Sequence, residues 1–393
     1  MSRMKGVAQA DVNHRKASSK GSAEDSDILS DIQKTSDGTE YEDTGIARPF
    51  NPVLINITSK QMSLDTLIRR IREGEVDLAP DFQRADVWKL KAKSRLIESL
   101  LIRIPLPAFY MDATDDEKWL VVDGLQRLST LKDFVINKTL FLQELEFLVQ
   151  FDQFGYDDLP RSFQRRIEET QVTVYLIEKG TPPEVKFNIF KRINTGGLPL
   201  SAQEIRHALN QGPVTAFLKA LADSGEFTRA TNDGVSDERM AARECVLRFF
   251  AFILTPAEKY KPDDFDAFLN EAMGKLNTMS EDEREKLARR FFRALDAAYA
   301  IFHEDAFRKP SRNNRKSPVN KALFEVYTVT LDKQSDETLQ CLEASRKMVT
   351  KKVIDFMRND AEFVNAISQG TGDVARVRRR FSSFERVIEE ALL

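Results

Sequence analysis

The stretch that decides the fold of this sequence is Trp119-Leu120-Val121-Val122-Asp123-Gly124-Leu125-Gln126-Arg127. The four apolar residues at its start predict a short buried strand, and Asp123-Gly124 ends that strand. Helical spacing of apolar residues follows at once, at Leu125, Leu128, Leu131 and Phe134. The stretch therefore predicts a strand, a tight glycine turn and a helix in immediate succession.

Two interpretations of this turn are open. In the functional one, the helix start favours an anion, and Gly124 lets a phosphate approach the backbone. Gln126 belongs to the same nucleotide-binding motif, and Arg127 adds a bidentate contact to the phosphate. Asp123 holds a Mg²⁺ ion that bridges phosphates. In the structural one, Asp123 merely caps the helix and Arg127 is solvated.

Two further loops carry polar residues suited to a nucleotide. Gln83 and Arg84 lie between Phe82 and Trp88, just before a helical pattern. Asn194-Thr195-Gly196 follows a basic helix end and precedes the capping box Ser201 to Glu204. The alternatives are a surface loop pinned by two aromatic residues, and a well-capped corner between two helices.

A basic loop in the C-terminal half is a candidate DNA contact. Five cations fall within nine residues, with turn formers between them, at Arg308, Lys309, Arg312, Arg315 and Lys316. Such a loop can neutralise DNA phosphates. The alternative is a solvated loop between helices, because charge runs are usually exposed.

The order of elements predicts an α+β fold in three parts. Residues 1–47 are polar and almost free of aromatic side chains, and they predict a disordered tail. Residues 48–212 mix short strands with helices. Residues 213–393 are almost wholly helical in pattern, which predicts an all-helical domain after a mixed one.

Composition excludes several classes of protein. The 393 residues carry a net charge of −3, so a uniformly basic surface for nucleic acid is excluded. Two cysteines and three histidines disfavour a disulfide framework and a zinc or histidine-metal nuclease site. We find no signal peptide or membrane-spanning run, and we expect a cytoplasmic protein without membrane contact.

The ordered set of motifs resembles the DGQQR-motif family, the N-terminal domain type of GmrSD modification-dependent restriction systems. The matching stretches include Asp81-Phe82-Gln83-Arg84, Val122-Asp123-Gly124-Leu125-Gln126-Arg127 and Arg192-Ile193-Asn194-Thr195-Gly196-Gly197. The resemblance implies a ParB/sulfiredoxin-like, nucleotide-binding N-terminal domain used in defence against phage DNA. It implies Asp123 and Arg127 as catalytic residues and an NTP with Mg²⁺ as cofactors. Leu125 departs from the family, which has Gln at that position.

Three functions follow from the resemblance and the residues. The first is an NTP-binding, NTP-hydrolysing component of a bacterial anti-phage restriction system. The second is a DNA-binding adaptor without nucleotide turnover, and the third is a stand-alone ParB-like nuclease. Family members that cut DNA often carry an HNH-type site, which three scattered histidines cannot build. We therefore expect a partner nuclease subunit, with DNA as the shared target.

Overall fold

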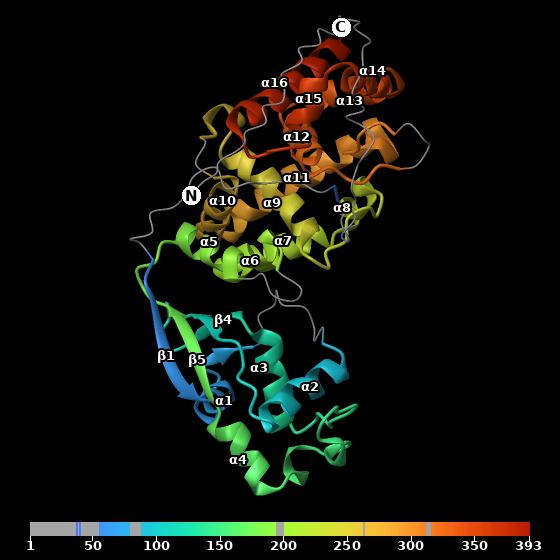
Figure 1. Cartoon of the computed structure of the whole chain (residues 1–393). Helices are drawn as coiled ribbons and strands as arrows, with labels where there is room; N and C mark the ends of the chain where they lie inside the picture. The colour runs from blue at the N-terminus through green and yellow to red at the C-terminus, as the bar shows by residue number, and fades with distance from the viewer. Residues whose placement is uncertain are drawn as a thin grey trace, which may run out of the picture. The chain divides into compact units, whose positions relative to one another are not determined.

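The computed structural model describes residues 37, 39–40, 55–78, 88–193, 200–261, 264–311 and 316–393 (Figure 1). Within these ranges, strands are mixed with helices up to residue 209, and from residue 213 the regular elements are helices. The predicted mixed α+β class with a helical C-terminal region is confirmed.

The strands form one sheet in the order β1-β5-β3-β4-β2. Their bounds are β1 (Ile57–Ser63), β2 (Val76–Asp77), β3 (Phe109–Asp112), β4 (Trp119–Asp123) and β5 (Gln171–Ile177). β5 pairs with β1 antiparallel and with β3 parallel, while β4 pairs with β3 antiparallel and with β2 parallel. β3 and β4 are therefore interior strands, and their ends are held from both sides.

Four helices cover one face of the sheet and share its main core. They are α1 (Leu64–Arg72), α2 (Leu90–Leu101), α3 (Leu125–Leu131) and α4 (Arg161–Glu169). Alternate strand residues point into this core, among them Val121 and Val174, where they pack with Leu67, Ile97 and Leu128. This burial of apolar area is what fixes the end of β4 against the start of α3.

The opposite face of the sheet packs on two later helices, α5 (Pro183–Ile193) and α6 (Ala202–Leu209). Val122 and Ile177 form a second, smaller core there with Phe187, Phe190 and Ile205. The apolar strand β4 is thus buried on both faces, which explains its continuous hydrophobic sequence.

Glu98 of α2 organises the long loop before α4. Its carboxylate is buried and accepts three backbone N–H groups, from Glu146 at 3.0 Å, Phe147 at 2.7 Å and Leu148 at 2.8 Å. Burial alone would raise the pKa of Glu98, but these donors and the charge of Arg95 outweigh burial and hold that pKa below its usual range. The loop is therefore fixed by a charged acceptor rather than by strand pairing.

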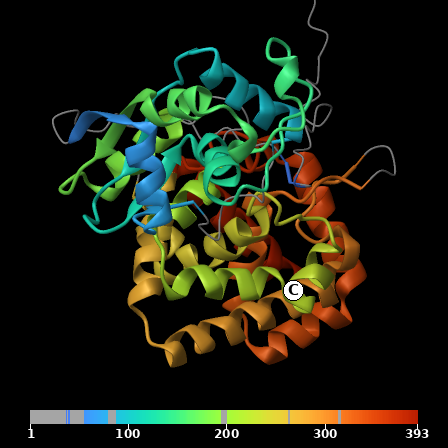
Figure 2. The same ribbon diagram turned by 90° about the horizontal axis from the view of Figure 1, so that it is seen from below.

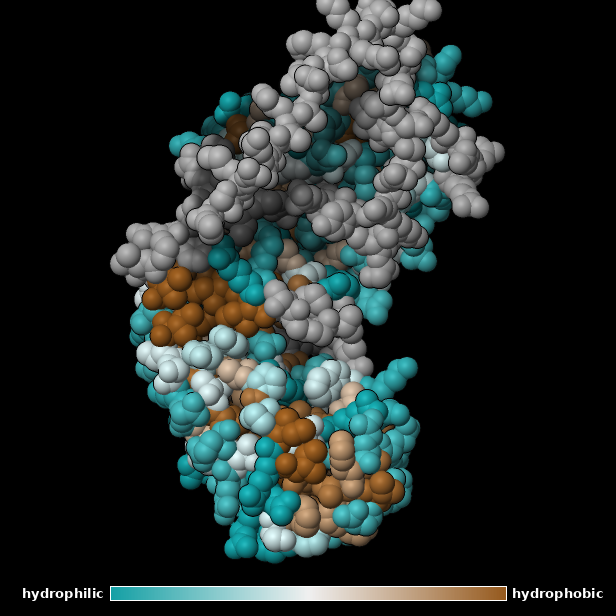
Figure 3. All heavy atoms as spheres, viewed as in Figure 1, coloured by the Kyte–Doolittle hydropathy of each residue, from teal (hydrophilic) through white to brown (hydrophobic). Residues whose placement is uncertain are grey.

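The C-terminal part is a helical bundle (Figure 2). It has its own core of buried aromatic and aliphatic side chains. Its helices are α7 (Pro213–Ala222), α8 (Gly225–Thr231), α9 (Ala241–Leu254), α10 (Phe265–Thr278), α11 (Glu281–Phe302), α12 (Lys321–Asp332), α13 (Asp336–Ala344), α14 (Arg346–Asn359), α15 (Ala361–Ala366) and α16 (Val374–Ala391). On the face drawn in Figure 3, hydrophilic side chains surround patches of hydrophobic ones. Among the described residues, we find no helix with the length and apolar character that crossing a bilayer requires.

Buried ion pairs run through this bundle. Arg380 and Glu325 are both fully buried, and Arg380 Nε donates to Glu325 Oε1 at 2.8 Å while Nη1 donates to the carbonyl of Thr371 at 2.6 Å. Burial alone would raise the pKa of Glu244, but its contacts with Lys321 and Arg248 and the nearby Arg206 hold it below its usual range. These charges are paired, as buried charges must be.

The structure differs from the predicted elements at the edges of both parts. The apolar residues Leu54, Ile55 and Ile57 predict a first strand near residues 54–57, but β1 runs over 57–63, and none of its residues is buried. An edge strand with this exposure shows no hydrophobic alternation for a sequence pattern to detect. The helical pattern of the C-terminal half predicts a single helix over 336–356, but the structure divides it at Ser345 into α13 and α14.

Three residues of the predicted disordered tail are ordered against the helical part. The backbone of Ser236 donates to Asp37 at 2.8 Å, the backbone of Glu40 donates to Val319 at 2.9 Å, and Thr39 is fully buried. The prediction of disorder is wrong for Asp37, Thr39 and Glu40, because average composition does not reveal single residues that find buried partners. The other residues of the predicted tail, 1–36, 38 and 41–47, lie outside the described residues.

The side chain of Glu40 makes the deepest of these contacts. Its carboxylate forms an ion pair with Lys309 and accepts a hydrogen bond from Asn320 Nδ2 at 2.9 Å. Both Glu40 and Lys309 are buried, and Lys309 Nζ also donates to Ser368 Oγ at 2.6 Å. A short N-terminal segment thus supplies a counter-charge inside the helical part.

Candidate functional site

The β4–α3 turn, residues 123–127, is built as the sequence predicts, with one change at the helix cap. Asp123 is the last residue of β4, and Gly124 occupies the N-cap position of α3 with φ at 100°. The interpretation of Asp123 as the helix cap is therefore wrong. Its Oδ2 instead accepts a hydrogen bond from Arg127 Nη2 at 2.8 Å.

The guanidinium of Arg127 is largely buried and has internal acceptors. Besides Asp123 it donates to the carbonyl of Pro107 and to the carbonyl of Ala108 at 3.1 Å, and it lies 4.5 Å from the centre of the Phe109 ring. Burial lowers the pKa of Arg127, and the charge of Asp123 opposes that shift. Arg127 thus joins the start of β3 to the end of β4. This arrangement differs from the solvated side chain of the structural interpretation. It also differs from the free cation that the functional interpretation assigns to a phosphate.

Gly124 is required for two reasons that the backbone makes clear. Its φ of 100° lies in the left-handed region, which side chains with a Cβ avoid. A Cβ added there would also collide with the ring of Phe109 and lie 3.1 Å from Arg127 Nη2. Close packing of the turn on Phe109 therefore explains this glycine before any ligand is considered.

Two oxygens of the turn are left for other partners. Asp123 is partly exposed, and while Oδ2 binds Arg127, Oδ1 has no hydrogen-bond partner among the described residues. The Oε1 atom of Gln126 is buried and likewise lacks a hydrogen-bond partner in the described part of the chain. A carboxylate oxygen held in place by a neighbouring arginine is a suitable ligand for a hard cation.

Two tyrosines that sequence reasoning missed lie beside Asp123 on the sheet. Tyr110 is the cross-strand neighbour of Asp123, and Tyr175 is the neighbour of Tyr110 on β5. Their rings stack with centres 4.8 Å apart and an interplanar angle of 18°. Burial raises the pKa of Tyr110, and Tyr175 and Asp123 add to this. The available sequence signal was the presence of one tyrosine in each of these two strands, Tyr110 in FYMD and Tyr175 in QVTVYLI.

The remaining residues predicted to bind the nucleotide are not placed. Gln83 and Arg84, and likewise Asn194, Thr195 and Gly196, lie outside the described residues. The capping box next to the second loop is confirmed, because Ser201 Oγ accepts from the backbone of Glu204 at 3.1 Å and Glu204 accepts from the backbone of Ser201.

The basic loop is only partly available at the surface. Arg308 is buried and donates to the carbonyls of Ser317 and Thr231, the latter at 2.8 Å, while Lys309 is paired with Glu40. The DNA contact predicted for Arg308 and Lys309 conflicts with these internal partners, because a buried cation cannot reach a DNA phosphate. Lys316 is partly exposed and pairs with Glu304 at 2.7 Å; Arg312 and Arg315 lie outside the described residues.

On the face of the sheet that α5 and α6 cover, an ion pair holds α5 in place. Lys186 Nζ lies 3.0 Å from Asp112 Oδ2 and also contacts Thr114 Oγ1, and both charged side chains are mostly buried. Farther along, Lys191 and Arg206 both bind Asp266 of α10, at 3.0 and 2.7 Å. These pairs position the two ends of the loop that contains Asn194 to Gly196.

The described residues contain no group of three or more histidine, cysteine, aspartate or glutamate side chains arranged to hold a metal ion. Any Mg²⁺ at the turn would therefore need ligand oxygens beyond those of the described residues. Phosphate oxygens of a bound nucleotide are the usual source of such ligands.

Comparison with known proteins gives one result. Residues 64–210 match the sequence profile of the family described as "GmrSD restriction endonuclease, N-terminal domain". The matched range begins at α1, ends just after α6 and contains the β4–α3 turn and both tyrosines. A search of curated proteins found no match to this chain. The family resemblance inferred from the motifs is thereby confirmed for this range.

Proposed function

Because residues 64–210 form a domain of the GmrSD N-terminal family, a restriction-system domain, we propose that this chain is the nucleotide-binding component of such a system. The domain binds an NTP with Mg²⁺ at the β4–α3 turn and hydrolyses it. It adopts the ParB/sulfiredoxin-like fold that the motifs imply. The observation that carries the proposal is the carboxylate of Asp123, of which Arg127 holds one oxygen while the other has no hydrogen-bond partner among the described residues.

Asp123 would hold the metal ion in this proposal. Mg²⁺ is commonly bound by one or two carboxylates together with substrate phosphates and water. Asp123 supplies one oxygen to Arg127 and offers the other outward, so the donor set fits a single-carboxylate site. When bound, Mg²⁺ would neutralise charge on the phosphates. Arg127 acts as a positioning residue that keeps the carboxylate at the end of β4.

The stacked tyrosines would receive the base. Tyr110 and Tyr175 are neither fully buried nor fully exposed, and they lie next to Asp123 on one strand register. Stacking on an aromatic side chain supplies about 1–3 kcal/mol per base with little preference among bases. This contact explains binding of an NTP, and it predicts weak selectivity between ATP and GTP.

The test is an NTP titration with Mg²⁺, read by calorimetry and by phosphate release. Asp123→Asn keeps the hydrogen-bond acceptor for Arg127 but removes the charge that Mg²⁺ prefers, so we expect hydrolysis to be abolished and binding to weaken less. The control is Asp116→Asn, an exposed aspartate in the turn before β4, which should behave as the original protein. Equal hydrolysis by Asp123→Asn at every Mg²⁺ concentration would refute the metal role.

DNA is cut by a partner subunit in this proposal. The family description names a restriction endonuclease, while the three histidines of this chain are scattered along it. Plasmid nicking by the isolated chain with Mg²⁺ and NTP would instead favour the ParB-like nuclease. DNA binding without any nucleotide effect would favour the adaptor, and binding that depends on NTP supports the proposal.

A further inference from the structure

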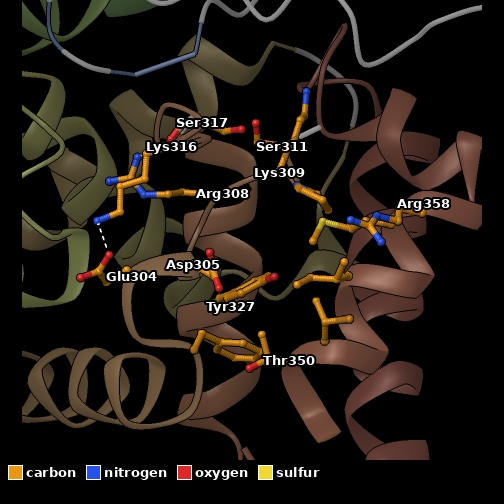
Figure 4. Close-up of a pocket in the computed structure, with 15 residues that line it drawn as sticks. Glu304, Asp305, Arg308, Lys309, Ser311, Lys316, Ser317, Tyr327, Thr350 and Arg358 are labelled. Carbon is orange, nitrogen blue, oxygen red and sulfur yellow. Dashed lines mark hydrogen bonds and ion pairs between the residues drawn. The ribbon is translucent and has the colours of Figure 1, made fainter. Parts of the chain in front are cut away.

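A cavity of about 270 Å³ lies in the helical part, between the loop after α11 and the helices α12 and α14 (Figure 4). This volume is close to the lower end of the range for small-molecule sites, roughly 300–1,000 Å³. Polar side chains line one side and apolar ones the other. The apolar side consists of Phe302, Val353, Ile354, Met357 and the ring of Tyr327.

Tyr327 supplies a buried hydroxyl that the protein leaves unused. The side chain is 1% exposed, and its ring stacks on Phe384 with centres 4.2 Å apart. Tyr327 Oη has no hydrogen-bond partner among the described residues, and Figure 4 shows it directed into the cavity. A hydroxyl that faces the cavity in this way can donate a hydrogen bond to a ligand held there. Burial raises the pKa of Tyr327, with a contribution from Asp305, so the hydroxyl stays a donor.

The cations around the cavity differ in what they can offer. Lys309 is paired with Glu40 and Lys316 with Glu304, so their charges are already balanced. Arg308 is held by backbone carbonyls, although its Nε is buried without a partner. Arg358 is exposed, has no ion pair to a described residue, and its guanidinium turns toward the cavity in Figure 4.

We propose that this cavity binds a small organic anion, a carboxylate or phosphate carried on a compact apolar body. The acid group accepts from Tyr327 Oη and pairs with Arg358, while the body packs on Val353, Ile354 and Met357. The exposed carboxylate of Asp305 lies on the lining and disfavours a ligand with several negative charges. The site is separate from the β4–α3 turn and does not depend on the proposed nucleotide function.

Four probes separate the acid group from the body that carries it. Benzoate and phenyl phosphate are the acids, and benzamide and phenol are their neutral counterparts. Each is titrated by calorimetry against the full chain. We expect at least one acid to bind, at least tenfold more tightly than its neutral counterpart. No binding of either acid at 10 mM, or equal binding of the neutral counterpart, would overturn the proposal.

Variants then place the binding in this cavity. Arg358→Gln should weaken the bound acid at least tenfold, and Tyr327→Phe should weaken it several-fold with unchanged circular dichroism. The control, Lys347→Gln, removes one charge from the same helix at an exposed position outside the lining and should have no effect. Asp123→Asn should also have no effect, which distinguishes this site from the proposed nucleotide site. Acid binding that survives both Arg358→Gln and Tyr327→Phe would refute the assignment.

Discussion

Replacing Arg127 by alanine should destabilise the ligand-free protein, and the structure gives the size of the loss. The guanidinium is 11% exposed, and it holds Asp123 and the carbonyls of Pro107 and Ala108. Hydrogen bonds to charged groups contribute about 1.5–3 kcal/mol each, but water can replace those on the partly exposed side. The contact with the Phe109 ring adds about 0.5–1 kcal/mol. We therefore expect the free energy of unfolding to fall by about 2–4 kcal/mol.

Urea denaturation followed by circular dichroism measures this loss without any nucleotide. Arg72→Ala is the matched control, because Arg72 is an exposed helical arginine of the same part of the chain. It should change the free energy of unfolding by less than about 0.5 kcal/mol. Arg127→Lys should fall between the two, since lysine keeps the charge but not the planar fork. A loss below about 0.5 kcal/mol for Arg127→Ala, with NTP affinity abolished, would refute the positioning role.

Three further outcomes follow from single positions. Gly124→Ala should lose at least about 1–2 kcal/mol of stability in urea titrations, because φ is positive and the new Cβ meets Phe109; an unchanged midpoint would contradict the turn geometry. Glu325→Ala leaves Arg380 buried without its partner and should cost about 3–5 kcal/mol by the same assay, whereas a neutral result would mean that the pair is not buried in solution. The pKa of Glu98 is lower in the folded than in the unfolded chain, so its stabilisation is present above the ordinary glutamate pKa of about 4.3 and is lost as pH falls through the folded value. The protection of the amides of residues 146–148, measured relative to the intrinsic exchange rate at each pH, should therefore fall on acidification, and Glu98→Gln should remove that dependence on pH.

The interior elements were predictable because their sequences are decided locally. β4 is a continuous apolar run, and its position between two cores makes that run necessary. The capping box at Ser201 and Glu204 was recognisable for the same reason, since both partners lie within one turn. The edge strand β1 was predicted too early in the chain, near residues 54–57, because pairing with β5, and not burial, keeps residues 57–63 extended.

The sequence places Asp123 and Arg127 at the turn between β4 and α3, but it does not reveal the internal contacts of that turn. The motif places Asp123 and Arg127 four residues apart, yet the carbonyls that hold Arg127 come from residues 107 and 108. Tyr175 reaches Tyr110 only through the parallel pairing of β3 with β5. Similarly, Lys309 finds Glu40 across 269 residues of sequence. Contacts of this kind depend on tertiary pairing, which spacing along the chain does not encode.

The contact between Glu40 and Lys309 also constrains the order of events during synthesis. Glu40 leaves the ribosome 269 residues before its counter-charge does. At about 5–20 residues per second, that interval is roughly 15–50 seconds. During this time residues 64–210, which match the GmrSD N-terminal domain family, are already synthesised and can fold. Lys309, the partner of Glu40, has not yet been synthesised. Docking of Glu40 must therefore be among the last steps of maturation, and a nascent chain halted before residue 309 should keep this segment accessible to protease.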